Sequence, residues 1–370
     1  MGVDPMYDLI VIGGGPAGTA TAILCARKGA RVLLLERGRL PRHKVCGEFV
    51  SAESLGLLAE LLDQQQDGDL LRDAIRIPRA RMFLDGRVLQ TRIEPAAASI
   101  ARLDLDAALW KAAEHAGVEA RQQVTAQRVA GTGPFVVTSS QGEHGARAVV
   151  NATGRWSNLN AESRPNGKAG AKWIGLKAHF AESAPPASVD LYFFDGGYCG
   201  IQPVNLAGGA EPQRINACAM VRADVASTMT EILALHPALR ERARRWQALS
   251  DPVSVGPLLF RKPQPEADGM LRVGDAAAFV DPFVGDGISL ALRSGALAAE
   301  CLIPFFAGKC DVGEAARRYA ERYERQLAPV LQTSSRIRRM LLLPRALRVP
   351  ILFLLENTPA ITRHLVTRTR

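Results

Sequence analysis

The sequence has no long hydrophobic run and no paired cysteines, and each absence excludes a class of protein. No stretch reaches the roughly 18–20 uninterrupted apolar residues that a membrane-spanning helix needs. The six cysteines include no CxxC pair, so neither a zinc site nor a disulfide framework is indicated. A strand that begins at about Tyr7 leaves no room for a signal peptide. We therefore expect no metal site and a cytoplasmic, reducing environment.

Internal repeats and low-complexity tracts are also missing, and the composition is that of an ordinary globular protein. Of the 370 residues, 47% are hydrophobic and 22% are charged, which is enough apolar material for a large core. A chain of this length is expected to form about two domains.

The net charge of +9 is concentrated at the C-terminus, where residues 336–370 contain eight arginines and one glutamate. No nucleic-acid-binding motif accompanies this basic tail, so we expect no nucleic-acid partner. Basic and apolar residues interrupted by prolines suit peripheral contact with an anionic inner membrane surface. They suit equally a lid over a substrate tunnel, or a terminal helix hairpin that packs on its own domain.

Residues 7–36 carry the pattern of a strand, a helix and a second strand. Residues 7–12 and 31–36 are short apolar runs, which are typical of buried parallel strands. Residues 19–28 are rich in alanine and end before Gly29, which predicts a helix. The three segments form one right-handed βαβ unit.

The turn that opens this helix predicts a dinucleotide site. It reads Gly13-x-Gly15-x-x-Gly18. The first glycine permits the tight turn, the second lets the backbone approach a pyrophosphate, and the third allows helix and strand to pack closely. The free N–H groups of the helix N-terminus then face the phosphates. Glu36 ends the second strand, where its carboxylate can accept both ribose hydroxyls.

A second glycine motif stands near the C-terminus. Gly274-Asp275 ends a short predicted strand and turn, and Gly285 and Gly287 precede a predicted helix over residues 287–302. With this motif the sequence resembles the FAD-dependent hydroxylase (monooxygenase) superfamily, in which such an aspartate binds a ribityl hydroxyl of the flavin. The resemblance implies that the helix points at the pyrimidine edge of the flavin ring, where its N-terminus stabilises negative charge.

Within that superfamily the sequence is most similar to the geranylgeranyl-reductase-like branch. The similarity is carried by residues 41–47, which contain Lys44-x-Cys46-Gly47, by residues 285–300, and by residues 198–204. The last segment resembles a sheet segment that ends in proline over the flavin. The similarity covers most of residues 6–330 and is weaker in the middle.

The resemblance implies an α/β fold with a Rossmann-like FAD-binding domain of the glutathione-reductase type, an inserted antiparallel-sheet substrate domain and a C-terminal helical tail. Strand patterns at residues 172–180, 189–194 and 214–221 are typical of an antiparallel sheet, and residues 79–84 can join it. Helices are expected over residues 101–117 and 315–331. We expect the FAD-binding domain at residues 6–77, 98–165 and 265–330, the substrate domain at 78–97 and 166–264, and the tail at 331–370.

The motifs and the resemblance together define a predicted FAD site. By the resemblance, Arg102 faces the flavin and Val124 occupies a strand position that offers backbone bonds to adenine. Arg42 and Lys44 contact phosphate or ribose, or else are solvated basic residues of a loop. The residues expected to bind FAD are Gly13, Gly15, Pro16, Ala17, Gly18, Glu36, Arg37, Arg42, Lys44, Cys46, Gly47, Arg102, Val124, Thr153, Gly154, Gly274, Asp275, Pro282, Gly285, Gly287 and Ile288.

Cys46 is the candidate catalytic residue. By the resemblance it lies near the flavin ring and the substrate, where a thiol of tuned pKa can donate a proton or position a substrate. A free cysteine is also often a small buried filler. Glu48 stands where that branch usually has a second glycine, and it is either an acid beside the site or a carboxylate at a helix start. His179, on an alternating strand, is expected to be structural.

We predict an FAD-dependent oxidoreductase that acts on a lipophilic small molecule and reduces a carbon–carbon double bond through reduced flavin. Two alternatives stay open: an FAD-dependent monooxygenase that hydroxylates a phenolic or polyketide-like substrate, and a non-enzymatic flavin electron carrier docked at a membrane. Halogenation is disfavoured because the sequence has no Trp-x-Trp-x-Ile-Pro stretch. Electrons come from NADPH or another external donor. Many relatives have a GADG-like turn where residues 151–154 read Asn-Ala-Thr-Gly, which disfavours direct NADPH recognition.

Overall fold

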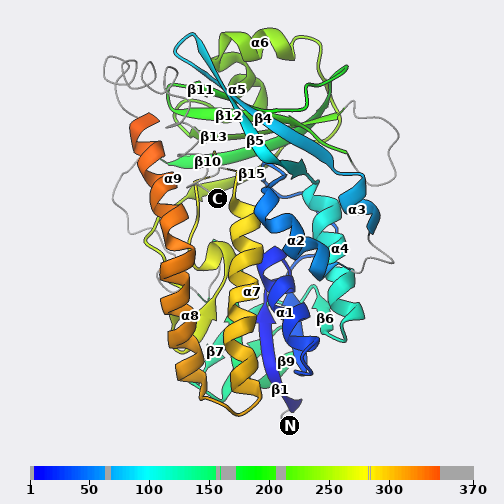
Figure 1. Cartoon of the computed structure of the whole chain (residues 1–370), viewed down its shortest axis with the longest axis vertical. Helices are drawn as coiled ribbons and strands as arrows, with labels where there is room; N and C mark the ends of the chain where they lie inside the picture. The colour runs from blue at the N-terminus through cyan, green and yellow to red at the C-terminus, as the bar shows by residue number, and fades with distance from the viewer. Residues whose placement is uncertain are drawn as a thin grey trace.

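The computed structural model describes residues 4–62, 68–155, 159, 172–205, 214–281, 283 and 285–341. Two β-sheets organise this part of the chain. One lies with the long helices in the lower half of Figure 1, and the other lies across its upper half. This arrangement confirms the predicted α/β fold class, in which a Rossmann-type sheet is combined with a second, mostly antiparallel sheet.

The first sheet has eight strands in the described residues, in the order β16-β17-β9-β1-β2-β6, and β8 and β7 continue from β9. The four central pairings, from β17 to β6, are parallel, and Ile12 lies opposite both Leu35 and Asn151. The strand bounds are Asp4–Ile12 for β1, Val32–Glu36 for β2, Glu119–Gln122 for β6, Ala126–Ala130 for β7, Phe135–Ser139 for β8, Gly142–Asn151 for β9, Glu266–Ala267 for β16 and Met270–Arg272 for β17.

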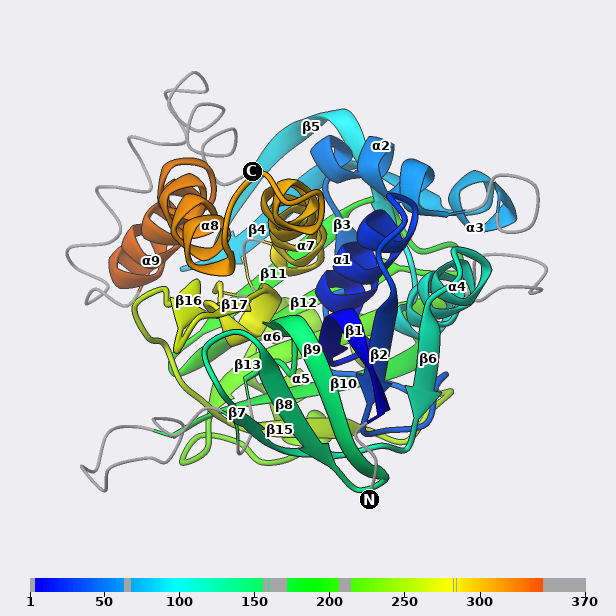
Figure 2. The same cartoon turned by 90° about the horizontal axis from the view of Figure 1, so that it is seen from below.

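The two faces of this sheet pack against different layers. Leu9 and Val11 of β1 belong to one apolar core with the helices α1 (Pro16–Ala26), α4 (Arg102–His115) and α7 (Gly287–Phe306). Ile10 and Ile12 point the other way, into a second core with the β7–β8 hairpin. Figure 2 shows the helices on one side of β1 and β9, and β7 and β8 beside them. Both faces of β1 are therefore buried, as its apolar run predicts.

The second sheet has nine strands in the described residues, in the order β14-β10-β13-β12-β11-β4-β5-β3, with β15 also paired to β10. Most neighbours are antiparallel, but β11 pairs parallel with β4 because β4 and β5 enter the sheet from earlier in the chain. The bounds are Phe49–Val50 for β3, Ile75–Leu84 for β4, Arg87–Ser99 for β5, Trp173–Ala181 for β10, Val189–Phe194 for β11, Gly197–Pro203 for β12, Arg214–Arg222 for β13, Gln247–Ala248 for β14 and Val253–Leu258 for β15.

Shorter helices cover the remaining surfaces. The helices α2 (Ala52–Leu61) and α3 (Gly68–Arg72) lie between β3 and β4 in sequence, and α5 (Met229–Leu235) and α6 (Pro237–Ala243) pack on the second sheet. The domain boundaries stay a prediction. The structure adds that β3, inside residues 6–77, pairs with β5 of the second sheet.

Two helices differ from the sequence prediction at their ends. The first helix begins at Pro16 rather than residue 19, because proline is preorganised for the first helical position. The helix expected over 315–331 is two helices, α8 (Val312–Gln326) and α9 (Ala328–Leu341). Asp311 caps α8 by accepting the Glu314 N–H, and Pro329, which lacks an N–H, lies in the first turn of α9.

The helix α7 is long and apolar enough to cross a membrane, and no other described helix is. However, 61% of its most apolar window is buried inside the molecule. Its buried residues belong to the same core as β1 and α1. We therefore interpret α7 as the central helix of a globular core.

Candidate active site

The glycine loop after β1 has the geometry of an anion site. Gly13 has a φ of +116°, a backbone conformation that residues other than glycine rarely adopt. A Cβ at Gly18 would lie 1.9 Å from the Gly13 carbonyl oxygen, whereas a Cβ at Gly15 would meet only the Lys44 amine, at 4.0 Å. No side chain caps the N-terminus of α1. Open space at Gly15 and uncapped N–H groups are what a pyrophosphate requires.

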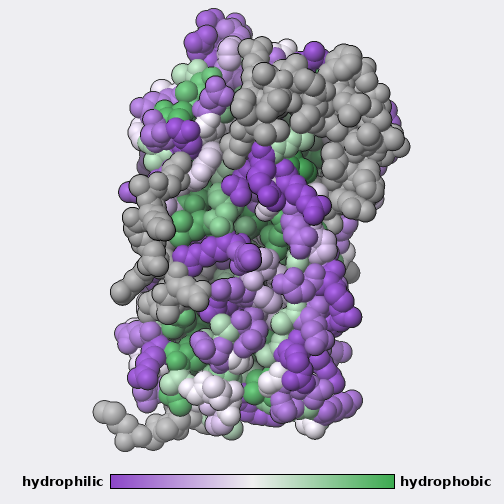
Figure 3. Space-filling view, turned by 90° about the vertical axis from the view of Figure 1, so that its left-hand side faces the viewer, coloured by the Kyte–Doolittle hydropathy of each residue, from purple (hydrophilic) through white to green (hydrophobic). Residues whose placement is uncertain are grey.

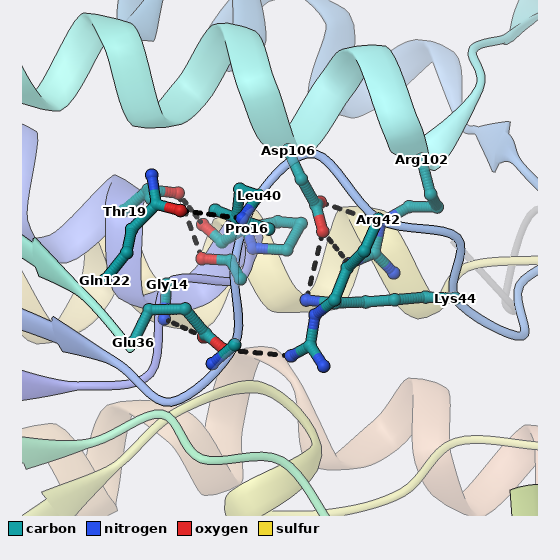
Figure 4. A network of polar contacts seen from close by, with 12 residues as sticks. Gly14, Pro16, Thr19, Glu36, Leu40, Arg42, Lys44, Arg102, Asp106 and Gln122 are labelled. Carbon is teal, nitrogen blue, oxygen red and sulfur yellow. Dashed lines mark hydrogen bonds and ion pairs between the residues drawn. The ribbon is translucent and has the colours of Figure 1, made fainter. Parts of the chain in front are cut away.

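Glu36, at the end of β2, is buried and anchors the loop. One carboxylate oxygen accepts the Gly14 N–H at 2.8 Å. The other accepts the Gly38 N–H at 2.7 Å and the Arg42 guanidinium at 2.8 Å. The carboxylate thus lies beside the glycine loop, at the position where the sequence predicts a ribose partner (Figure 4).

A network of charges borders the same space (Figure 4). Arg102 binds buried Asp106 through two hydrogen bonds of 2.9 Å, and the Lys44 amine lies 3.0 Å from the same carboxylate. Burial would raise the pKa of Asp106, but Arg102 and Lys44 lower it below its usual range. Asp106 therefore holds two cations at the wall of the site, and Lys44 reaches toward Gly15.

The late glycine motif approaches the first one in space. Gly274, with a φ of +58°, opens the short 3-10 turn Gly274–Ala276, and a Cβ there would lie 3.0 Å from the Ala17 Cβ. Burial raises the pKa of Asp275, against the opposing charges of Arg155 and Arg102. Arg155 lies 3.6 Å from the Asp275 carboxylate. Gly287 then opens α7 at the same site.

Two residues that we expected to contact the cofactor already use backbone or side-chain groups in hydrogen bonds within the protein. Val124 lies between β6 and β7, and its N–H donates to the Glu36 carbonyl at 3.0 Å. It can therefore offer only its carbonyl to an adenine. Thr153 donates its N–H and its hydroxyl to the Asn151 side chain, at 3.1 and 2.7 Å. Gly154 follows with a φ of +78°.

Cys46 lies in a turn that joins the two sheets. Its sulfur accepts the Glu48 N–H at 3.4 Å, and its carbonyl accepts the Asn216 amide at 3.0 Å. Burial would lower the pKa of Arg102, but Asp106 and Cys46 raise it above its usual range. The Cys46 thiol thus lies beside a permanent cation.

Glu48 is the centre of a buried cluster that the sequence did not predict. It is fully buried and has a φ of +61°, where glycine is favoured. Its carboxylate accepts hydrogen bonds from Lys177, from His179 at 2.9 Å and from the Arg102 N–H at 2.9 Å. Burial would raise the pKa of Glu48, but His179 and Lys177 lower it. Glu48 is therefore a carboxylate at neutral pH and not an acid.

One cavity of about 600 Å³ connects these groups. The structure places all the expected site residues in its wall except Gly18, which packs beneath the loop, and Pro282, which lies outside the described residues. The roles of the wall residues in FAD binding stay predictions. The sequence missed a further group of wall residues: His43, Arg155, Gly175, Cys218, Met220, Val255, Leu258 and Phe279.

The cavity has an apolar end, formed by several of the missed residues, and a polar end. Gly175 and Met220 lie opposite each other on β10 and β13 of the second sheet, and with Val255, Leu258 and Phe279 they form an apolar end. The glycine loop, Glu36 and the cations form a polar end. Hydrophobic side chains on separate strands give no local pattern that could have revealed this apolar end.

Comparisons with known proteins agree with this geometry. Residues 8–154 match the family model described as FAD dependent oxidoreductase. A digeranylgeranylglycerophospholipid reductase of Methanopyrus kandleri is 28% identical over 350 residues, which cover 86% of this chain and 83% of that protein. A menaquinone reductase of Mycobacterium tuberculosis is 29% identical over 335 residues, which cover 82% and 78%.

Solved structures show the same fold. The flavin-dependent brominase Bmp2 superposes with a TM-score of 0.79 and 21% identity, over 99% of this chain and 93% of that one. The whole described architecture, both sheets and the C-terminal helices, is thus shared with a flavoprotein of known structure.

Proposed function

We propose that this chain, which is an FAD-dependent oxidoreductase, reduces a carbon–carbon double bond of a lipophilic small molecule. The observation that carries the proposal is the position of Cys46, a thiol in the cavity wall between the cation Arg102 and the apolar end. The residues present fit FAD, because the glycine loop has room for a pyrophosphate and cations surround it. The two reductases named among the relatives support the reaction type.

Three neighbouring titratable groups of the described cavity wall are poorly suited to donate the proton that we assign to Cys46. Glu48 is held as a carboxylate by His179 and Lys177. Burial, with Lys177 and His179, lowers the pKa of His43, so its imidazole is mostly neutral at neutral pH. Burial raises the pKa of the Cys218 thiol far above its usual range, which makes it a very weak acid.

The reaction adds a hydride to one alkene carbon and a proton to the other. Bound FAD, once reduced by an external donor, supplies the hydride. Cys46 gives its proton to the second carbon and becomes a thiolate. Arg102 and the Glu48 N–H stabilise that thiolate, and water returns the proton after product release. The cavity wall positions the alkene and excludes water while the two transfers occur.

The apolar end of the cavity supports a lipophilic substrate. Met220, Val255, Leu258 and Phe279 offer no hydrogen-bonding side chain to a polar substrate group. The substrates named for the two reductase relatives, a digeranylgeranyl lipid and menaquinone, are themselves lipophilic. We propose peripheral contact between the basic tail of a cytoplasmic protein and an anionic membrane as the route by which such a molecule arrives.

Halogenation is the alternative that the brominase fold raises. It would need a lysine whose amine is free in the cavity. Among the described residues at the site, Lys177 is bound by Glu48 and Lys44 by Asp106. Both amines are therefore engaged by carboxylates, and this disfavours halogenation. Hydroxylation with oxygen stays the second alternative.

An anaerobic single-turnover experiment tests the proposal. The FAD-loaded protein is photoreduced without oxygen, mixed with an unsaturated isoprenoid phospholipid that carries no quinone, and followed by flavin absorbance and product mass. We expect reoxidation and a product heavier by two hydrogen atoms. Cys46→Ala should slow reoxidation by about 100-fold, whereas Cys310→Ala, remote from the cavity, should not.

Three outcomes would count against the proposal. Failure of every unsaturated lipid to reoxidise the flavin would overturn it. Reoxidation that requires oxygen and adds one oxygen atom would favour the monooxygenase, and reversible reduction without any turnover would favour the electron carrier. Cosedimentation with phosphatidylserine vesicles, but not with phosphatidylcholine vesicles, tests the membrane contact separately.

A further inference from the structure

The C-terminal helix α9 reaches the apolar end of the cavity through one arginine. In Figure 1 this helix extends from the end of α8 toward the level of the second sheet. The face that α8 and α9 occupy carries apolar areas between its hydrophilic side chains (Figure 3). Most of the basic tail lies beyond Leu341, outside the described residues. Of the three arginines described in α9, Arg338 is the one that is partly buried, whereas Arg336 and Arg339 are exposed.

Arg338 makes two contacts there. Its guanidinium carbon lies 4.0 Å from the centre of the Phe260 ring, and its Nε lies 2.9 Å from the Asp281 carboxylate. The side chain of Asp281 is 1% exposed, and that of Arg338 is 22% exposed. The Arg338 N–H is not aligned for a hydrogen bond, and the Phe283 backbone also faces the Asp281 carboxylate. Charge and ring stacking therefore hold this contact.

The contact continues into the cavity wall. The Phe260 and Phe279 rings are 5.4 Å apart, and Phe279 lines the cavity. Arg155 lies 4.4 Å from the centre of the Phe279 ring and 3.6 Å from Asp275. These contacts thus form a series that begins and ends in the segment after β17. In order, its members are Asp281, Arg338, Phe260, Phe279, Arg155 and Asp275.

We propose that α9 forms the outer wall of an aromatic subsite for the apolar part of the substrate, with Arg338 as its positioning residue. The subsite comprises Phe279, Phe260, Leu258 and Val255, and it takes an unsaturated or aromatic hydrocarbon group. Arg338 fixes Phe260 and, through it, Phe279, while its charge holds Asp281, which precedes Gly285 of the cavity wall. The inference deepens the proposed function and rests on this cavity being the substrate site.

The buried pair of Asp281 and Arg338 is not explained by stability alone. Burial raises the pKa of Asp281 to about 7, although Arg338 lowers it, and Tyr198 also faces this carboxyl. A buried ion pair commonly contributes less stability than well-packed apolar residues of equal volume. The pair is therefore better explained by the specific position that it gives to the aromatic wall.

The test measures access to the cavity without relying on turnover. N-ethylmaleimide labels the FAD-loaded protein, and peptide mass spectrometry gives the rate constant at Cys46, which lies in the cavity wall. FAD held at the glycine loop would cover the polar end, so we expect the reagent to enter past the aromatic wall. We expect Arg338→Ala to raise this rate at least about fivefold. Arg336→Ala removes the same charge from an exposed position of α9 and should stay within about twofold of the wild type.

Two further variants complete the test. Asp281→Asn keeps the shape of the carboxyl and should raise the rate like Arg338→Ala. Arg338→Lys keeps the charge but stacks less well, so it should restore part of the protection. Equal labelling rates in Arg338→Ala and Arg336→Ala would overturn the proposal. If Arg338→Ala does not fold, as judged by retained FAD absorbance and thermal unfolding, Asp281→Asn decides alone.

The reaction itself distinguishes a positioning role from a purely structural one. With a substrate from the single-turnover experiment, Arg338→Ala should raise KM by at least about fivefold and change kcat by less than about twofold. An equal loss in kcat with unchanged KM would overturn the subsite. If the labelling rate depends on Arg338 but the protein has no reductase activity, the subsite proposal stands and the proposed reaction is wrong.

Discussion

Glu48 and Lys177 form an ion pair whose side chains are 0% and 2% exposed. Glu48 lies in the turn that carries Cys46, just before β3, and Lys177 lies on β10 of the second sheet. Removing one partner of such a pair leaves an unpaired buried charge, which costs about 3–5 kcal/mol. The pair therefore determines how the cysteine turn is attached to the second sheet.

We predict that Glu48→Met and Lys177→Met each lower the free energy of unfolding by about 3 kcal/mol, and that the double variant Glu48→Met/Lys177→Met recovers most of it. Urea denaturation of the FAD-loaded protein measures this coupling. The exposed pair of Arg244 and Glu241, 67% exposed at both side chains, is the matched control. Glu241→Gln should change the free energy by less than about 0.5 kcal/mol. Additive losses at Glu48 and Lys177 would contradict the prediction.

The same cluster predicts a loss of stability in acid. His179 and Lys177 lower the pKa of Glu48 below its usual value of 4.5 in the folded protein, although burial opposes them. The unfolded chain therefore binds a proton more readily than the folded one. The stabilisation is present above the unfolded pKa and is lost as the pH falls through the folded pKa. Urea midpoints between neutral pH and pH 3 should fall less steeply for Glu48→Gln, and parallel curves would show that Glu48 does not contribute.

Two glycines of the first loop should respond differently to alanine. A Cβ at Gly18 would lie 1.9 Å from the Gly13 carbonyl oxygen, so Gly18→Ala should cost at least about 3 kcal/mol or prevent folding. A Cβ at Gly15 meets only the Lys44 amine at 4.0 Å, so Gly15→Ala should fold normally. It should nevertheless weaken FAD binding by at least about tenfold, because the methyl group occupies the space for the pyrophosphate. Ultrafiltration and thermal unfolding separate the two effects, and normal FAD affinity in Gly15→Ala would refute the placement.

Local patterns explain why much of the first sheet could be predicted from the sequence. Residues 9–12 and 32–36 are buried on both faces, so the apolar runs there are continuous. The Gly13–Gly18 turn requires glycine for reasons that concern adjacent atoms alone. Residues of these local motifs also line the cavity, so that part of the cavity wall could be predicted.

The rest depends on contacts between distant parts of the chain. Glu48 meets Lys177 across 129 positions, and no periodicity connects them. Its φ of +61° is one that glycine normally occupies. The only indication of this in the sequence was that Glu48 stands where the geranylgeranyl-reductase-like branch usually has a glycine. His179 was expected to be structural, and the structure places it on Glu48. The parallel pairing of β11 with β4 likewise follows from tertiary packing.

Lys44 should bind the pyrophosphate of FAD, and its replacement tests the polar end of the cavity. Its amine lies 3.0 Å from Asp106 and is the nearest group to the open side of Gly15. Lys44→Met removes a cation beside two phosphates, which should weaken FAD binding by about tenfold at low salt and by less at high salt. Asp106 keeps both Arg102 hydrogen bonds, so stability without FAD should change little. Arg39→Met, which removes an exposed charge nearby, should leave the affinity unchanged. Equal affinities in the two variants would place the pyrophosphate away from Lys44.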